Sequence, residues 1–214
     1  MVPKTVMRRS VLVQNVGVDA NYVFKNAEQI QTIYWTNALC ETAVILATWA
    51  PGFLPTGTLT LLARYPDGAR DIRFTATWLS GCLLMHFGSF IRLSCYRALG
   101  SNFTWELAVK KGHVLVTTGP YAIVRHPSYV GALSIYVGAF CTIFGPGSWF
   151  NECIGWDTTA SWLLAGVCGS WALGIPMLLM GRVNREDEVL RREFGEEWEA
   201  YAKKVPYKLF PFVY

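Results

Sequence analysis

Gly119-Pro-Tyr-Ala-Ile-Val-Arg-His-Pro-Ser-Tyr-Val-Gly131 is the most informative segment of the chain, because it joins a charged, aromatic cluster to a long apolar run. Residues 128–151 contain no ionisable side chain other than tyrosine and cysteine. Such a run can cross a hydrocarbon core of about 30 Å, which needs roughly 20 residues. The segment therefore predicts a group of reactive side chains at the mouth of a membrane span.

Pro127 sets the expected local geometry of this segment. A proline keeps the residue before it extended and is favoured as the first residue of a helix, so we expect His126 at a helix N-terminus. Such a terminus presents free backbone N–H groups and a partial positive charge, and Arg125 adds a planar set of donors that fits carboxylate or phosphate. We expect an anionic group to dock here.

The composition indicates a membrane protein. Hydrophobic residues make up 52% of the 214 residues and charged residues 16%, below the roughly 25% of soluble domains. We predict an all-α fold, a polytopic membrane bundle of about four to five spans, in two regions, 1–99 with about two spans and 100–214 with two more. The candidate spans are residues 30–54, 74–91, 128–150 and 158–181.

Lysine and arginine predict the orientation, because they are enriched in cytoplasmic loops. The loop 145–157 has no basic residue, whereas loop 55–73, with three arginines, is the exception to the pattern. We therefore expect an integral, multi-pass protein whose C-terminal helical segment and active site face the cytoplasm. The basic residues of that tail are Arg182, Arg185, Arg191, Arg192, Lys203, Lys204 and Lys208.

A second cluster follows the last span. Arg182 and Glu186 are four residues apart, so they lie on one face if the helix continues, and we expect Trp198 and Tyr201 to continue that face. The third and fourth spans are antiparallel neighbours, which brings this cluster near Arg125. The alternative is an ordinary amphipathic helix with solvated ion pairs.

Several kinds of site are not expected. The six cysteines include no CxxC pair, and no histidine has a helical partner four residues away, so neither a disulfide framework nor a metal site is predicted. The glycine pattern of dinucleotide-binding folds is absent from the sequence. The net charge of +4 forms no basic stripe, which argues against nucleic-acid binding.

The ordered motifs from about residue 100 onward resemble the isoprenylcysteine carboxyl methyltransferases. They are His113-Val-Leu-Val-Thr-Thr-Gly-Pro-Tyr121, Arg125-His-Pro-Ser-Tyr-Val-Gly131, Arg182-x3-Glu186 and Phe194-Gly-Glu-Glu-Trp198. The resemblance implies transfer of a methyl group from S-adenosyl-L-methionine to the C-terminal carboxylate of a prenylated cysteine, in proteins processed at a CaaX motif. It further implies an endoplasmic reticulum membrane and a C-terminal segment that closes over the cofactor.

The resemblance also implies a role for each matching residue. Arg182 would meet the substrate carboxylate and act catalytically, with Arg125 as its assistant. The implied cofactor-binding residues are His113, Val114, Leu115, Val116, Tyr121, His126, Pro127, Ser128, Tyr129 and Glu186. An α-carboxyl group with an ordinary pKa near 3.5 is already an anion at neutral pH, so the reaction needs no general base.

Other functions stay open at this point. The first hundred residues match no motif of the family, and Asp187 stands where a glutamate is common. A phospholipid or amine N-methyltransferase would use the same methyl donor but would have to deprotonate its nucleophile. A nicotinamide-dependent membrane reductase and a non-enzymatic scaffold of four spans are the remaining alternatives.

Overall fold

The computed structural model describes residues 20–100 and 114–213, and within these ranges it contains helices and no strands. The all-α fold class is therefore confirmed for this part of the chain. The elements follow in the order α1 (Ala20–Trp49), α2 (Thr58–Leu62), η1 (Pro66–Arg70), α3 (Ala76–Leu99), η3 (Gly119–Ala122), α4 (Pro127–Phe144), η4 (Phe150–Ile154), α5 (Thr159–Phe194) and α6 (Glu196–Lys204).

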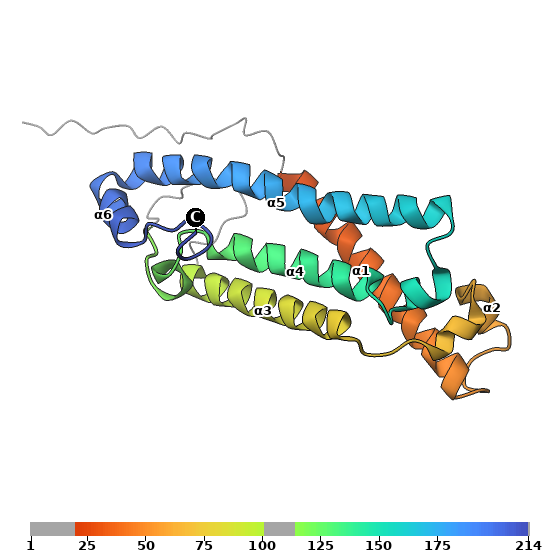
Figure 1. The fold of residues 1–214 in the computed structure, drawn as a ribbon. Coiled ribbons are helices and arrows are strands. Elements are labelled where there is room, and N and C mark those ends of the chain that lie inside the picture. The colour runs from red at the N-terminus through yellow and green to blue at the C-terminus, as the bar shows by residue number, and fades with distance from the viewer. Residues whose placement is uncertain (1–19, 101–113, 214) are drawn as a thin grey trace, which may run out of the picture.

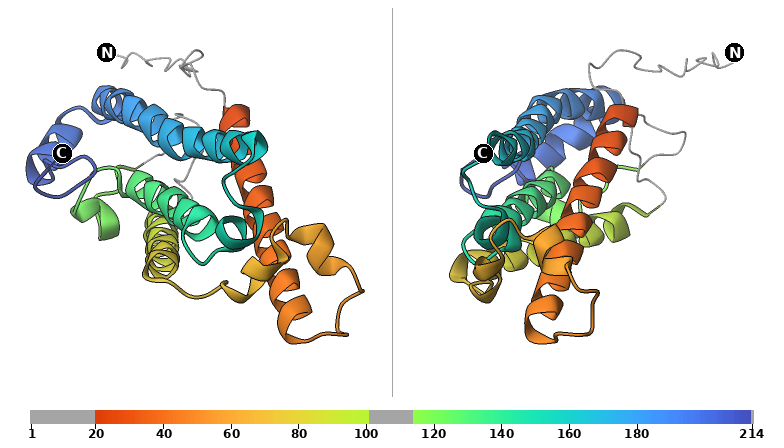
Figure 2. Two further views of the ribbon diagram at one scale, coloured as in Figure 1. Left: turned by 45° about the vertical axis from the view of Figure 1, so that its right-hand side comes forward. Right: turned by 90° about the vertical axis from the view of Figure 1, so that its right-hand side faces the viewer.

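Three long helices lie along one another, with α3 beside α4 and α4 beside α5, as Figure 1 shows. Helix α1 crosses them obliquely (Figure 2). Helix α6 and the C-terminal residues gather at the end where α3 finishes and α4 begins, whereas α2, η1 and η4 gather at the opposite end (Figure 1). The residues of the two predicted clusters therefore meet at one end of the bundle.

Helices α3 and α4 approach closely because both carry glycines seven residues apart, Gly81 and Gly88 on α3 and Gly131 and Gly138 on α4. A Cβ atom added to Gly88 would lie 2.4 Å from the carbonyl oxygen of Gly131, and one added to Gly138 would lie 2.5 Å from that of Gly81. Small residues at a helix contact allow this approach, which is common within membranes. The contact fixes the start of α4 against α3.

A helix occupies each predicted span, but the bounds differ. The span predicted for 128–150 ends as a helix at Phe144, six residues early, because Pro146 lacks an N–H group and Gly147 has φ 80°. By length and composition alone, α4 is the one helix among the described residues that could cross a membrane. The fold shown is thus helical, with one clearly apolar span.

Helix α5 is continuous over 36 residues. Thr158 caps its start by accepting a hydrogen bond from the Ser161 N–H at 3.0 Å, and the helix passes residue 181 without a break. The predicted continuation through Arg182 and Glu186 is therefore confirmed. The expectation that the same face continues to Trp198 is wrong, because Gly195 has φ 54° and turns the chain into α6.

Candidate active site

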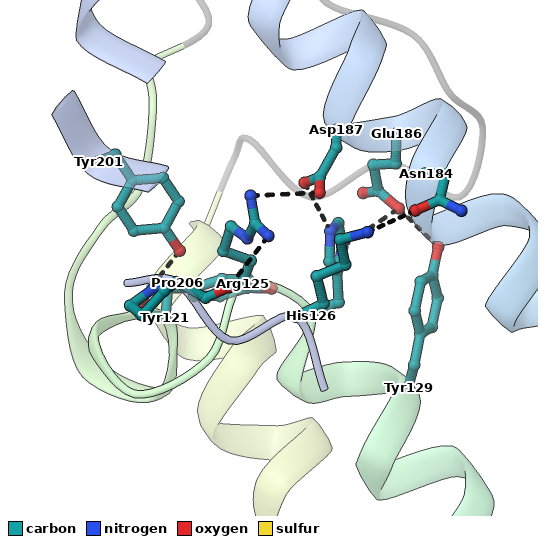
Figure 3. A network of polar contacts seen from close by, with 10 residues as sticks. Tyr121, Arg125, His126, Tyr129, Asn184, Glu186, Asp187, Tyr201 and Pro206 are labelled. Carbon is teal, nitrogen blue, oxygen red and sulfur yellow. Dashed lines mark hydrogen bonds and ion pairs between the residues drawn. The ribbon is translucent and has the colours of Figure 1, made fainter. Parts of the chain in front are cut away.

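Two consecutive acidic residues of α5 contact the beginning of α4 (Figure 3). His126 Nε2 lies 2.9 Å from Asp187 Oδ1, and its Nδ1 lies 3.7 Å from Glu186 Oε2. The hydroxyl of Tyr129 donates to the same Glu186 oxygen at 2.6 Å. The imidazole of His126 and the ring of Tyr129 are nearly parallel, with centroids 5.8 Å apart. Both aromatic residues are therefore held by carboxylates.

The sequence explains why these side chains meet. Pro127 is the first residue of α4 and His126 is its N-cap, as the X-Pro geometry predicts. His126 and Tyr129 are three residues apart, so both side chains lie on the side of the first turn that faces α5. The antiparallel run of α4 and α5 then brings Glu186 and Asp187 level with this turn.

Arg125 is held in three ways. Its Nη1 lies 3.3 Å from Asp187 Oδ2, its Nη2 donates to the carbonyl oxygen of Pro206 at 3.2 Å, and its guanidinium lies 5.6 Å from the ring centroid of Trp198. Its side chain is 10% exposed and that of Asp187 is 11% exposed, so this ion pair is nearly excluded from solvent. Removing either Arg125 or Asp187 would leave the charge of the other without a counter-charge and nearly excluded from water.

Residues 205–209, which we call the C-terminal strap, close the edge of the site. The backbone N–H of Arg125 donates to the carbonyl of Tyr207 at 3.0 Å, and that of His126 donates to the carbonyl of Lys208 at 2.9 Å. Val205 and Leu209 are buried at either end of the strap. The ammonium group of Lys208 also donates to Asn184 of α5 at 2.6 Å. The strap therefore ties the loop before α4 to α5.

Helix α6 packs behind the site on the segment that leads into it. Leu115, Trp198, Tyr201 and Val205 form a buried cluster, and the hydroxyl of Tyr201 donates to the Tyr121 carbonyl at 2.8 Å. Burial raises the pKa of Tyr201 to about 12, although the nearby Arg125 charge opposes the rise. Burial likewise raises the pKa of Tyr121. Both phenols are therefore neutral at physiological pH.

The structure brings together most of the residues predicted for the site. His126 and Tyr129 contact Glu186, Arg125 contacts Asp187 beside it, and Pro127 begins α4. Ser128 faces α3 instead of α5. Arg182 lies one turn before Glu186, is partly buried, and acts electrostatically on Tyr129. Of the predicted 113–116 segment, Leu115 is buried against α6, Val116 is partly buried and Val114 is 60% exposed. His113 lies outside the described residues.

Asp187 and the strap were missed by the sequence analysis. Asp187 is 8% exposed and contacts both Arg125 and His126, so it is a buried carboxylate beside two basic residues. Its position beside Glu186, in place of a common glutamate, was the available signal. Two donors of the site, Arg125 Nε and Trp198 Nε1, are buried and have no acceptor among the described residues. They give the site capacity for further acceptor atoms.

Comparison with known proteins finds similarity to a family of methyltransferases. The sequence model of the isoprenylcysteine carboxyl methyltransferase (ICMT) family matches residues 81–164, which include α4 and its preceding loop. Protein-S-isoprenylcysteine O-methyltransferase of Homo sapiens is 37% identical over 142 residues, which cover 64% of this chain and 43% of that protein. The enzyme of the same name from Xenopus laevis is 30% identical over 188 residues, covering 86% and 54%.

A reductase also shows similarity. Delta(14)-sterol reductase of Saccharomyces cerevisiae is 31% identical over 109 residues, which cover 51% of this chain and 21% of that protein. The chain spans about half the length of the methyltransferases that it matches. The resemblance indicated by the ordered motifs is thus confirmed, and the family to which it points is that of the isoprenylcysteine carboxyl methyltransferases.

Proposed function

We propose that this protein transfers a methyl group from S-adenosyl-L-methionine to the C-terminal carboxylate of a prenylated cysteine. The observation that carries the proposal is the convergence of the two motif clusters. His126 and Tyr129 at the start of α4 contact Asp187 and Glu186 on α5, one turn from Arg182. Side chains that converge on one interface with opposite charges are the usual mark of a functional site.

The donors and acceptors of the site fit this cofactor. The carboxylates of Glu186 and Asp187 would accept from its α-ammonium group and ribose hydroxyls, and the aromatic face of Tyr129 suits a sulfonium cation. The buried N–H groups of Arg125 and Trp198 lack acceptors among the described residues and would donate to its carboxylate. When bound, S-adenosyl-L-methionine supplies an electrophilic methyl group. The residues of this chain bind and orient it and exclude water.

Arg182 would orient the carboxylate of the substrate. The nucleophile is a carboxylate that is ionised at neutral pH, so positioning and desolvation are the tasks that remain for the protein. A guanidinium offers two parallel donors that fix the plane of a carboxylate. Because the charge of the nucleophile decreases during the reaction, we expect Arg182 to align the carboxylate without fully neutralising it. Arg125, already held by Asp187 and Pro206, would assist by its charge.

An apolar pocket lies deeper in the bundle, where α1, α4 and α5 meet. Its lining includes Ile33 of α1, Tyr136 and Phe140 of α4, and Trp171 of α5. Tyr136 is seven residues beyond Tyr129, or about 10 Å along the helix axis. A lipid chain attached to a cysteine held at the start of α4 would reach this pocket. We assign the pocket to the isoprenyl group.

We further propose that the chain is a multi-pass membrane protein with this site on the cytoplasmic side of the endoplasmic reticulum. Large apolar side chains are exposed along α3 and α5, as expected for surfaces that face lipid. They include Leu79, Leu83, Phe87 and Phe90 on α3 and Trp162, Leu163 and Leu173 on α5. The division of the chain at residue 100 stays a prediction.

The orientation has its own test. Asn102-Phe-Thr104 has the pattern of an N-glycosylation site and lies outside the described residues. In the proposed orientation this segment faces the cytoplasm and stays unmodified during translation with microsomes. Glycosylation at Asn102 would show that this segment faces the lumen and would contradict the proposed orientation.

A reductase is the second candidate, because the sterol reductase matches half of this chain. Titrating the purified protein with S-adenosyl-L-methionine and with NADPH separates the two, since we expect saturable binding of the first alone. Methyl incorporation into farnesyl-cysteine, its carboxamide and an aminophospholipid then identifies the acceptor. We expect the free carboxylate alone to be methylated. Methylation of the lipid without that of farnesyl-cysteine would contradict esterification and support the amine alternative.

A further inference from the structure

Arg92, on the last third of α3, faces the first turn of α4 and belongs to none of the motifs. Its Nη1 donates to the Ser128 hydroxyl at 3.2 Å and to the Ser128 carbonyl at 3.4 Å. Its Nη2 donates to the hydroxyl of Tyr96, one turn further along α3, and the guanidinium lies 5.3 Å from the centroid of that ring. Arg92 is therefore fixed by Tyr96 of its own helix and binds Ser128 of α4.

The glycine contact between α3 and α4 makes this reach possible. A Cβ atom at Gly131 would lie 2.8 Å from Cγ of Arg92 and 2.8 Å from the carbonyl oxygen of Gly88. The stem of Arg92 thus occupies the space that a side chain at position 131 would fill. The guanidinium of Arg92 lies beside Ser128. In the chain, Ser128 lies between His126 and Tyr129, the two aromatic residues of the site.

The uncharged partners of Arg92 distinguish it from an ordinary arginine at a helix end. Within the described ranges its contacts are to a hydroxyl, a carbonyl and a phenol, all uncharged. An arginine in an apolar helix is retained only when it has a specific partner or extends to the headgroup region. Arg97, five residues later on the same helix, is exposed. Arg92 instead turns toward α4.

The first turn of α4 is consequently fixed from two sides. On the α5 side Asp187 and Glu186 hold His126 and Tyr129, and on the α3 side Arg92 holds Ser128. A second contact from α3 supports the same loop, because the buried thiol of Cys95 interacts with Tyr121. Because Ser128 lies between His126 and Tyr129 in the chain, movement of Ser128 relative to α3 would also shift these two residues relative to α5.

We propose that Arg92 is a positioning residue for the methyl-transfer site, which sets the distance of His126 and Tyr129 from the carboxylates of α5. The inference rests on the proposed function, since the group that these residues then hold is S-adenosyl-L-methionine. Arg92 itself does not touch the cofactor. Its loss should therefore weaken cofactor binding while leaving the affinity for the prenylated substrate unchanged.

The test compares Arg92→Gln and Arg92→Lys with Arg97→Gln, which makes the same change of charge at an exposed position of the same helix. The full-length variants are placed in lipid nanodiscs, and calorimetry gives the Kd for S-adenosyl-L-methionine while methylation gives KM for farnesyl-cysteine. We expect a Kd about tenfold higher for Arg92→Gln, about threefold higher for Arg92→Lys, and unchanged for Arg97→Gln. KM for farnesyl-cysteine should stay within twofold of wild type.

The outcomes separate the two proposals. A purely structural role would lower the active fraction and the melting temperature but leave the cofactor Kd of the folded molecules unchanged, and that result overturns the inference. If Arg92→Gln fails to fold, Arg92→Lys decides, because a wild-type Kd in that variant also overturns it. A wild-type protein that binds no S-adenosyl-L-methionine would overturn the proposed function and, with it, this role of Arg92.

Discussion

The imidazole Nε2 of His126 lies 2.9 Å from the carboxylate of Asp187, although 61 positions separate the two residues in the chain. This contact joins the loop before α4 to the C-terminal part of α5. Arg125 shares the same carboxylate at 3.3 Å, so one buried acid contacts both Arg125 and His126. The stability of the site and its shape therefore depend on the same side chain.

Replacement of Asp187 tests this dependence. Asp187→Asn should lower the free energy of unfolding by about 3–5 kcal/mol, because the nearly buried guanidinium of Arg125 would lose its counter-charge. Glu188→Gln, which removes an exposed ion pair with Arg192, should change it by less than about 0.5 kcal/mol. Denaturant midpoints in a mild detergent provide the measurement. Equal midpoints for the two variants would contradict the assignment.

Glu186 is expected to act on the cofactor. Loss of its charge-assisted hydrogen bonds in Glu186→Ala should weaken binding of S-adenosyl-L-methionine by about 1.5–3 kcal/mol, roughly tenfold or more. Tyr129→Phe, which frees the Glu186 carboxylate from one donor, should perturb binding less. Calorimetry on folded protein measures both, with Glu188→Ala as the control. Unchanged affinity in Glu186→Ala removes this residue from the site.

Arg182 should be sensitive even to lysine. An ammonium group cannot reproduce the paired donors of a guanidinium, so Arg182→Lys is expected to lose about tenfold or more in kcat/KM for farnesyl-cysteine and to keep its cofactor affinity. Arg185→Lys makes the same exchange at an exposed position one turn further along and should be neutral. A fully active Arg182→Lys variant would refute the carboxylate-orienting role.

The glycine contact predicts a large effect from one methyl group. In Gly88→Ala the new Cβ would lie 2.4 Å from the Gly131 carbonyl, so α3 and α4 must separate, at a cost of about 1–3 kcal/mol. Gly166→Ala on α5 has no atom within 4 Å of its Cβ and should be neutral or stabilising by up to about 1 kcal/mol. Unfolding midpoints compare the two. A harmless Gly88→Ala would mean that the helices are further apart.

Tyr201 predicts a loss of stability at high pH. Its pKa rises on folding from an ordinary 10.0 to about 12, so the folded state holds the proton more tightly. The contribution to stability is complete below pH 10 and is lost as the pH rises from 10 to 12. Tyr201→Phe should flatten the pH dependence of the unfolding free energy in this window. An identical slope in wild type and variant would show that Tyr201 titrates normally.

Much of the helical arrangement was predictable because apolar periodicity and helix-start signals are local. The Arg182–Glu186 register follows from helix spacing, and the start of α4 follows from Pro127. The end of α4 was misplaced because apolar composition continues past Phe144, although Pro146 already signals the break. Likewise, the apolar pattern predicted that the face of α5 continues to Trp198, but Gly195 turns the chain between α5 and α6.

The missed parts of the site depend on tertiary packing. Glu186 and Asp187 point about 100° apart on an ideal helix, so the sequence alone does not show that both acids contact residues at the start of α4. The strap contributes through its carbonyl oxygens, which every residue possesses, so no side-chain pattern reveals it. Arg92 was overlooked because its partner, Ser128, lies on another helix.

The strap, at residues 205–209, is the last part of the site to be synthesised. Pro206, which accepts from Arg125, is added to the chain 81 residues after it. At synthesis rates of about 5–20 residues per second, the loop before α4 waits about 4–16 s for these acceptors. The nascent chain therefore completes α4 well before it can complete the site at the end of that helix. A chain that ends between residues 201 and 206 would contain every motif through Tyr201. It would lack the strap carbonyls that accept from the backbone N–H groups of Arg125 and His126.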